Sequence, residues 1–309
     1  MSNGSAPARW TLDELVRAGS GADDVVVWAS PSVRARVAAR LPFPIRPIGA
    51  PLSGARMLVV VGGGTLIDQA KAFVATQAPL VRLVAVPTLW GSGAEASRIT
   101  IASVGGEKRV TIDDSWVPEA RVIWPELLET VSPELARYAS GDVLTHALEG
   151  LLSPLAGPEV RSISARCLRE AIELPVRPDP RWLDVSADAC AAQARASVGL
   201  AHGIAHTLEG RVGAEFGHAR LVSTFVWPVL EFDLGSSDKI VRLLESLEVQ
   251  VELVRRRARE VFDESDYRAL LPALEVHWPS VLRDPSTRLN SALVRPRALD
   301  HFLGWSGRE

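Results

Sequence analysis

The stretch VVVGGGTLIDQAK, residues 59–71, decides the fold. The β-branched run that begins at Met57 predicts a strand buried on both faces of a sheet. Three glycines end the run, and residues 65–76 predict a helix. Glycines at such a turn let backbone N–H groups approach a phosphate, and the start of the helix adds a favourable partial charge. An ordinary strand-to-helix turn explains three glycines equally well.

Neighbouring segments extend this pattern into a parallel sheet. Val25–Trp28 predicts an earlier strand, followed by a helix through Arg40, and Val81–Val86 predicts a later strand. Strand, helix and strand in close succession indicate a right-handed βαβ unit. A second glycine loop, VPTLWGSGAEAS at 86–97, follows the later strand. Both loops then lie at the carboxyl edge of the sheet, where such folds bind ligands, which favours a nucleotide site.

The pattern becomes almost entirely helical after Pro133. The predicted helices cover residues 133–152, 158–174, 184–210, 219–232, 237–262 and 265–283. We therefore expect an α/β domain with a Rossmann-like parallel sheet at 1–130 and an all-α domain at 131–309. RPDPRW at 177–182 predicts a turn or loop, and Arg255–Arg257 predicts a solvated helix face.

Composition limits the class of protein. The net charge of −3 over 309 residues argues against a charge-driven role with nucleic acid. Apolar runs are too short for a transmembrane helix, and the first residues lack a hydrophobic signal core, so we expect no membrane partner. Only Cys167 and Cys190 are present, which implies no disulfide framework and suits a reducing cytoplasm.

Four of the six histidines lie between residues 146 and 218. Asp142 and His146 are four residues apart in GDVLTHALEG, and His202 and His206 repeat that spacing in LAHGIAH, followed by His218. On a helix, each pair shares one face. One carboxylate with two or three imidazoles suits Fe²⁺ or Zn²⁺. Taken singly, each pair is also explained as a surface hydrogen-bonded pair or as chance.

The remaining polar candidates favour structural roles. Glu149, on the face of Asp142 and His146, is expected to cap or pair rather than to ligate a metal. His277 and His301 lie outside the motifs and are expected to be structural, and Asp68 with Lys71 is explained by a surface ion pair. Three tryptophans are expected in the core or a pocket wall: Trp90, Trp116 and Trp124.

Together these segments resemble the iron-containing (group III) alcohol dehydrogenase family. The resemblance covers roughly residues 56–232, with a weaker match at DPSTRLN, residues 284–290. GGGTLIDQAK is similar to the diphosphate loop GGGSxxDxAK, and VPTLWGSGAEAS to the cofactor loop PTTxGTGSE. GDVLTHALEG resembles DALTHAIE, and GLAHGIAHTLEG with a later histidine resembles HGxAHxLG and PHG. Several such motifs in the family's order are specific.

The resemblance implies roles for particular residues. The implied metal ligands are Asp142, His146, His202 and His218, and His206 is the implied proton relay and catalytic residue. The implied cofactor-binding residues are Gly62, Gly63, Gly64, Thr65, Asp68, Thr88, Gly91, Gly93 and Lys108.

Several positions depart from the family pattern. Leu89 and Trp90 replace smaller residues in the cofactor loop, which reshapes a nicotinamide or ribose contact. The gap from His206 to His218 is longer than usual, and Ala219 replaces the glycine that follows the last ligand, so His218 is the least secure ligand. Trp28-Ala29-Ser30 has no carboxylate for the adenosine ribose, which leaves NAD or NADP open and tilts toward NADP. Residues 29–61 lack room for the family's extra strand and helix, which marks a shortened, divergent member.

The family's architecture is dehydroquinate synthase-like, and its chemistry gives the expected function. We expect a metal-dependent, NAD(P)-linked alcohol dehydrogenase or carbonyl reductase that transfers hydride between a metal-bound alcohol and nicotinamide. The expected cofactors are Fe²⁺ or Zn²⁺ with NAD or NADP, and the expected form is a cytoplasmic homodimer.

The substrate stays open. It is a small alcohol or carbonyl compound, or a hydroxyl carried on a peptide. In the second case the enzyme tailors a natural product by oxidising a β-hydroxy acid, which then loses CO₂. The alternatives are a sugar-phosphate cyclase of the 3-dehydroquinate synthase type and a degenerate homologue without catalysis.

Overall fold

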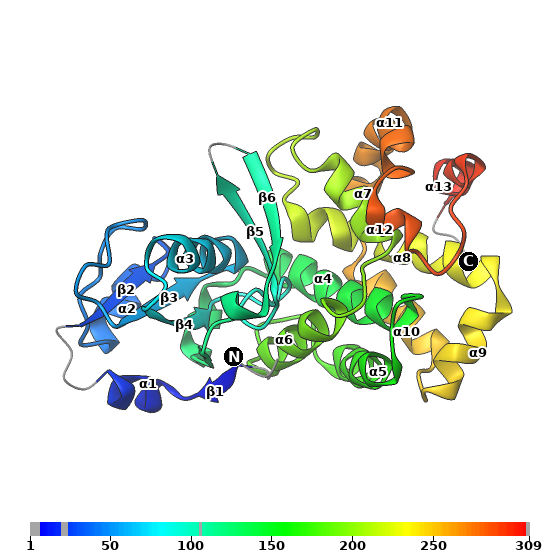
Figure 1. Cartoon of the computed structure of the whole chain (residues 1–309). Coiled ribbons are helices and arrows are strands. Elements are labelled where there is room, and N and C mark those ends of the chain that lie inside the picture. Colours follow the sequence, from blue (N-terminus) through cyan, green and yellow to red (C-terminus); the bar gives the residue numbers. More distant parts are fainter. Residues whose placement is uncertain (1–6, 20–23, 105–106, 307–309) are drawn as a thin grey trace. The chain divides into compact units, whose positions relative to one another are not determined.

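The computed structural model describes residues 7–19, 24–104 and 107–306 (Figure 1). The chain divides into two compact units. The first comprises Met1–Ser132 with Pro178–Ala187, and the second comprises Pro133–Arg177 with Asp188–Glu309. The short segment Pro178–Ala187 therefore packs with the α/β unit although it lies within the helical half of the sequence.

A five-stranded sheet forms the centre of the first unit. Its strands are β1 (Ala8–Trp10), β2 (Val25–Ala29), β3 (Met57–Gly62), β4 (Arg82–Pro87) and β7 (Ala120–Val122). They follow the order β1-β7-β4-β3-β2, and every neighbouring pair is parallel. The parallel sheet predicted for this half of the sequence is confirmed.

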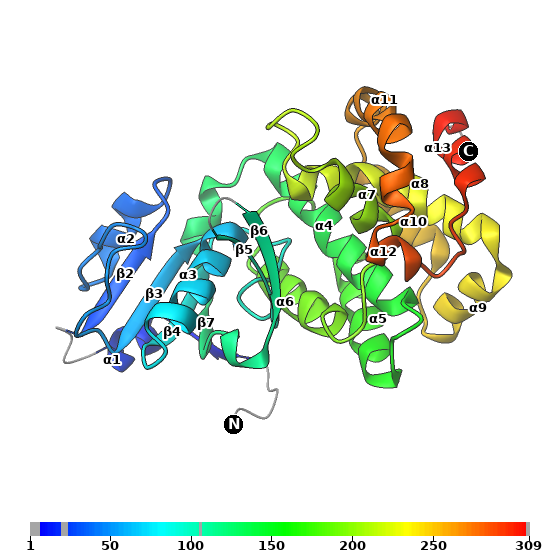
Figure 2. The same ribbon diagram turned by 45° about the horizontal axis from the view of Figure 1, so that its top comes forward.

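Strand β3 is buried on both faces, as its β-branched sequence predicts. Val59 and Val61 join a core with α1 (Leu12–Ala18) and α2 (Arg34–Arg40). Leu58 and Val60 point to the opposite face. There they pack with α3 (Gly64–Gln77), which lies along the sheet in Figure 2. The strand thus holds the glycine turn between two packed layers.

Some elements of this unit were not predicted from the sequence. A hairpin of β5 (Ile99–Val104) and β6 (Glu107–Ile112) forms an antiparallel pair, and β5 packs against α3. Between β2 and β3, Ile45 makes a single parallel bridge to Val27 in place of a full strand. The unit's short 3₁₀ helices are η1 (Asp114–Trp116) and η2 (Pro125–Thr130).

Helices make up the second unit. They are α4 (Pro133–Leu152), α5 (Pro158–Glu173), the end of α6 (Arg181–Gln193), α7 (Leu200–Leu208), α8 (His218–Ser236), α9 (Asp238–Ser246), α10 (Val251–Val261), α11 (Glu264–Val281), α12 (Pro285–Arg288), η3 (Pro296–Ala298) and α13 (Leu299–Gly304). Helix α4 is central, because it is buried almost all round and packs against α5 and α8. A Cβ added at Gly141 would lie 2.2 Å from Ser223 Oγ, so glycine permits the close approach of α8.

Two predicted helices are wrong in length. The segment 184–210 is split into α6 and α7 by residues 194–199, and Gly199 precedes α7 with a non-helical backbone. The segment 237–262 is split into α9 and α10 near Glu248, whose φ of 58° is left-handed. A residue in that conformation cannot continue a right-handed helix.

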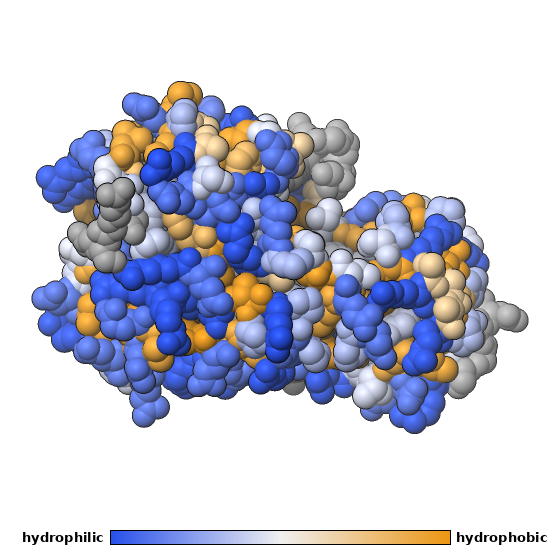
Figure 3. All heavy atoms as spheres, turned by 180° about the vertical axis from the view of Figure 1, so that it is seen from behind, coloured by the Kyte–Doolittle hydropathy of each residue, from blue (hydrophilic) through white to orange (hydrophobic). Residues whose placement is uncertain are grey.

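One part of the predicted arginine face is also wrong. Arg257 is buried, and its guanidinium donates hydrogen bonds to the carbonyls of Ile172 and Leu174. Elsewhere, a few large apolar residues such as Leu155 and Val276 are exposed. Hydrophobic side chains are interspersed among hydrophilic ones on the face seen in Figure 3. Within the described residues, no helix is both long enough and apolar enough to cross a membrane.

Candidate metal and cofactor sites

Helix α4 provides the first part of a candidate metal site. Asp142 and His146 lie one turn apart on this helix, and both side chains are buried. His146 Nε2 lies 3.4 Å from Asp142 Oδ1. The i,i+4 spacing read from the sequence therefore places both groups on one face of a buried helix, where a surface hydrogen-bonded pair is excluded.

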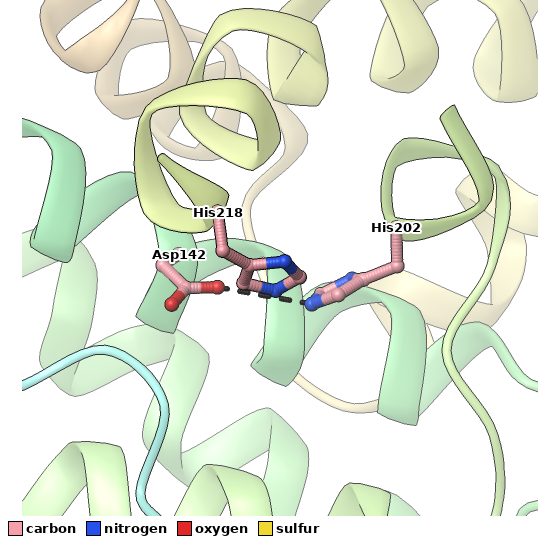
Figure 4. A group of neighbouring side chains, drawn as sticks. All are labelled: Asp142, His202 and His218. Atoms are coloured by element: carbon pink, nitrogen blue, oxygen red, sulfur yellow. Dashed lines mark ion pairs between the residues drawn. The ribbon is translucent and has the colours of Figure 1, made fainter. Parts of the chain in front are cut away.

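Two further helices bring histidines to Asp142. His202 lies in the first turn of α7, and His218 is the first residue of α8. One ligand atom from each of Asp142, His202 and His218 lies within 4.8 Å of the others (Figure 4). Three ligands from three helices at this spacing form a set that can hold one divalent ion.

The structure places the other two sequence candidates beside this trio. The ring of His146 is centred 4.4 Å from that of His202, although His146 is outside the trio itself. The ring of His206 is centred 5.6 Å from that of His218, and its side chain is about one third exposed. His146 therefore lies beside the trio, its role as a ligand remains a prediction, and His206 lies nearer solvent.

The polar atoms of this site fit a metal ion. Asp142 Oδ1, His146 Nδ1 and His202 Nε2 are buried and make no hydrogen bond within the described part of the chain. Burial lowers the pKa of His146 to about 3 and also lowers the pKa of His202, so both rings are neutral near pH 7. An uncompensated buried carboxylate costs several kcal/mol. A divalent cation would satisfy these atoms, and the nitrogen and oxygen donors suit Fe²⁺ or Zn²⁺.

Glu149 orients His202. The Nδ1 atom of His202 lies 2.7 Å from Glu149 Oε2, which fixes the ring and leaves Nε2 for the metal. The same carboxylate accepts hydrogen bonds from the backbone N–H groups of Gly199 and Ala201, at the start of α7. The prediction that Glu149 caps or pairs is therefore confirmed. Outside the site, His301 Nε2 lies 2.9 Å from the carbonyl of Pro228, in agreement with a structural role.

The first glycine loop lies in the α/β unit. Gly62 ends β3, Gly63 is the N-cap of α3, and Gly64 begins the helix, with Thr65 in its first turn. A Cβ added at Gly63 would meet no atom within 4 Å, whereas one at Gly64 would lie 2.1 Å from Ser92 Oγ. The two glycine loops are therefore in contact at Gly64. The space beside the Cα atom of Gly63 is open to a ligand.

Asp68 and Lys71, both in α3, support the second glycine loop. Both are buried, so the explanation by a surface ion pair is wrong. Lys71 Nζ lies 3.2 Å from Asp68 Oδ1 and also donates to three backbone carbonyls, those of Ala94, Ser97 and Ile99. Asp68 Oδ2 accepts a hydrogen bond from Ile101 N. The contacts of Asp68 in this structure are with the loop and hairpin, and contact with a cofactor remains a prediction.

The second loop is shaped by glycine and by residues of α6. Gly91 and Gly93 have φ values of 119° and 52°, which side chains disfavour. The hydroxyl of Ser186 bonds both the N–H and the carbonyl of Gly91. Thr88 is buried at the end of β4. Lys108 lies in β6, and its side chain is outside the described residues.

Trp90 fills the interior of the unit. It is buried and stacks on Trp182 of α6, with ring centres 6.0 Å apart. The prediction of a core or pocket-wall tryptophan is confirmed for Trp90 and for Trp124, which is also buried. Sequence reasoning missed Trp182 and Ser186, because they support the loop from a segment more than 90 residues away.

Glu95 of the second loop gives a pH prediction. It is buried, and burial raises its pKa to about 7 from an ordinary value of 4.5. Its contribution to stability is thus full below pH 4.5 and is lost as the pH rises through about 7. Glu95→Gln does not ionise, so its free energy of unfolding relative to wild type should rise by about 1–3 kcal/mol between pH 4.5 and 8.

Urea unfolding at several pH values measures this difference. The exposed Glu126→Gln serves as the control and should follow wild type throughout. Parallel pH curves for Glu95→Gln and wild type would show that Glu95 does not titrate in this range.

Comparison with known proteins finds similarity to alcohol dehydrogenases. The family model described as iron-containing alcohol dehydrogenase matches residues 51–125. The 1-propanol dehydrogenase of Salmonella typhimurium is 26% identical over 293 residues, which cover 80% of this chain and 77% of that protein. The chain spans less than two thirds of the length of three further curated relatives, namely 45%, 61% and 56%.

Solved structures share the fold over almost the whole chain. The iron-containing alcohol dehydrogenase of Thermococcus thioreducens has a TM-score of 0.78 and 21% identity, covering 99% of each chain. A sulfoacetaldehyde reductase from Bifidobacterium kashiwanohense, solved with NAD⁺, has a TM-score of 0.75 and 15% identity, covering 99% of this chain and 98% of that one. The combination of an α/β unit and a helical unit is thus the fold of these proteins.

Proposed function

We infer that this chain, which belongs to the iron-containing alcohol dehydrogenase family, is an oxidoreductase that transfers hydride between a CH–OH carbon and the nicotinamide of NAD or NADP. The observation that carries the proposal is the trio of Asp142, His202 and His218. Within it, Asp142 Oδ1 and His202 Nε2 are buried and make no hydrogen bond within the described residues. Fe²⁺ is the proposed metal and Zn²⁺ the alternative.

The residues of the helical unit have defined tasks in this reaction. A divalent metal, when bound, supplies Lewis acidity toward the oxygen of the substrate. Asp142, His202, His218 and the adjacent His146 would hold it, and Glu149 keeps His202 in one orientation. His206, partly exposed and beside His218, would take the hydroxyl proton and pass it to solvent.

The glycine loops have the complementary task of holding the cofactor. The open space at Gly63, at the start of α3, would receive the diphosphate against backbone N–H groups. The hydroxyl of Ser186 and the buried Asp68–Lys71 pair keep the second loop in place before any ligand arrives. A site formed in advance binds without the cost of ordering its loops.

Metal-dependent turnover tests this proposal. Protein loaded with Fe²⁺ or Zn²⁺ is expected to reduce NAD⁺ or NADP⁺ with a primary alcohol such as 1-propanol, and chelator-treated protein is not. The 1-propanol dehydrogenase among the relatives supports this choice of first substrate. Protein that retains neither metal and catalyses no cofactor reduction across a panel of alcohols, aldehydes and keto acids would overturn the proposal. Cyclisation of a sugar phosphate without net NADH release would point to the other enzyme class.

The end of β2 leads to a prediction on cofactor choice. Trp28, Ala29 and Ser30 place no carboxylate there, and the hydroxyls of Ser30 and Ser32 lie 3.3 Å apart. We expect NADP to bind at least as tightly as NAD, because no charge opposes its 2′-phosphate. Ser30→Asp should weaken NADP binding by about tenfold or more and leave NAD binding nearly unchanged. Titration of both cofactors measures the ratio, and a wild type that prefers NAD tenfold would contradict it.

A finer proposal is oxidation of a β-hydroxy acid, such as a peptide that ends in threonine, to a β-keto acid that loses CO₂. The shortened stretch at 29–61 and the substitution at Leu89 support this proposal. Trp90 does not support it, because its ring is buried against Trp182. Release of CO₂ from such a peptide would support it, and high kcat/KM for 1-propanol would count against it.

Location in the cytoplasm and assembly into a homodimer remain predictions for this protein. Cys167 and Cys190 are both buried, and no disulfide joins them, which supports the prediction of a reducing compartment. The mass of the protein in solution checks the homodimer.

A further inference from the structure

Residues Asp284–Asn290 contact helix α7 at three points, each one helical turn apart. Asn290 Oδ1 accepts a hydrogen bond from Leu200 N at 3.0 Å. Thr287 lies against Gly203, where an added Cβ would be 2.1 Å from Thr287 Oγ1. Asp284 Oδ2 lies 3.9 Å from His206 Nδ1. The spacing of three residues on both segments shows that they run side by side in opposite directions.

The start of α7 is held from two sides. Glu149 of α4 accepts from the N–H groups of Gly199 and Ala201, both at 2.7 Å, and Asn290 accepts from that of Leu200 between them. These N–H groups have no partner within the helix, so side chains must satisfy them. The N-terminal end of α7, and with it His202, is therefore fixed by Glu149 and Asn290.

Asn290 is itself held in place. Its Nδ2 donates to Asp233 Oδ1 at 2.7 Å and to the carbonyl of Ala292 at 3.2 Å. Asp233 belongs to α8, the helix that begins with His218, and its side chain is buried. Asn290 thus connects the helix of His202 with the helix of His218, independently of any metal.

We propose that Asp284–Asn290 is a brace that fixes the rotation of α7 about its own axis and its position along that axis. Thr287 and Asn290 are then positioning residues for His202. The proposal rests on the metal site of the proposed function. Helix α7 has only nine residues and begins after a non-helical glycine. The hydrogen bonds within so short a helix do not fix its position relative to the neighbouring helices. Contact of Thr287 with the bare backbone at Gly203 fixes how closely the brace approaches, because any side chain there would push the two apart.

A pair of substitutions with a built-in rescue tests the brace. Gly203→Ala inserts a Cβ against Thr287 Oγ1, and Thr287→Ala removes that atom. We expect Gly203→Ala to weaken Co²⁺ binding by about 10- to 100-fold and to shift the visible Co²⁺ absorption bands. The double variant should recover wild-type affinity to within about threefold. The control is Gly235→Ala in α8, where an added Cβ meets nothing within 4 Å, and it should bind Co²⁺ like wild type.

The outcomes separate this inference from the proposed function. Gly203→Ala with wild-type affinity and spectrum, or a double variant no better than the single one, would overturn the brace. Should Gly203→Ala fail to fold, Asn290→Ala replaces it, with the same expected loss of affinity and a spectral shift that a folded but unaffected site would not show. Wild-type protein that binds no Co²⁺ would instead overturn the metal site itself.

Discussion

Asp142→Asn is expected to lower the rate of alcohol oxidation by at least about 10³-fold, which corresponds to about 4 kcal/mol. The substitution preserves the shape of the side chain and removes the one carboxylate of the trio. Without that charge the site loses most of its attraction for a divalent ion, because the remaining imidazole ligands do not replace the charge of a carboxylate. Steady-state kinetics with added Fe²⁺ or Zn²⁺, together with the metal content of the purified variant, measure both losses.

His277→Ala is the control. This histidine lies outside the site, so the variant should keep both its metal and its activity. Thermal unfolding of both variants without metal shows whether the folds are comparable. An Asp142→Asn protein that retains metal and turns over alcohol within tenfold of wild type would contradict the assignment of Asp142.

Gly63→Ala is expected to weaken binding of NAD or NADP by about tenfold or more while the protein folds as wild type. The backbone at Gly63 has φ −77° and ψ 176°, which any residue adopts, and an added Cβ meets no protein atom within 4 Å. A glycine needed only for the turn would therefore tolerate alanine. A glycine needed for close approach of a diphosphate would not, because the methyl group occupies the ligand's space.

The chain contains a closely matched control. Gly157 is the N-cap of α5 with φ −75° and ψ 172°, and a Cβ there also meets nothing. Both variants should lose at most about 0.5 kcal/mol of stability, as expected for alanine in place of glycine at an N-cap. Fluorescence titration of each with NADPH and NADH gives the comparison. Equal cofactor affinities for Gly63→Ala, Gly157→Ala and wild type would show that the loop is an ordinary turn and does not bind the cofactor.

The three strands β2, β3 and β4 and most of the long helices were predictable because their patterns are local. The run from Met57 is short, rich in β-branched residues and apolar at every position, as expected of a strand covered on both faces, and the structure has that strand. The break between α6 and α7 was not predictable. Residues 194–199 include good helix formers, and the chain leaves the helix where Glu149 binds Gly199 N and the hydroxyls of Ser153 and Ser197 meet at 2.8 Å. Such tertiary contacts override helix propensity.

The candidate site was accessible to sequence reasoning only in part. Helical spacing pairs Asp142 with His146 and His202 with His206, but it cannot show which helices meet. His218 was the least secure candidate because of its distance from His206, yet the turn at 209–217 returns it to within 4.8 Å of Asp142 and His202. The support from Ser186, Thr287 and Asn290 depends on packing between distant segments, which no single motif records.

The transfer of deuterium is the most direct test of hydride transfer at a metal site. The alcohol that turns over fastest, labelled with deuterium at its carbinol carbon, is incubated with NAD⁺ or NADP⁺ and metal-loaded protein, and the reduced cofactor is analysed by mass spectrometry. We predict that the reduced cofactor carries one deuterium, and that it forms only when metal is present and Asp142 is intact. Reduced cofactor without deuterium, or labelled cofactor formed equally by metal-free protein, would contradict the account.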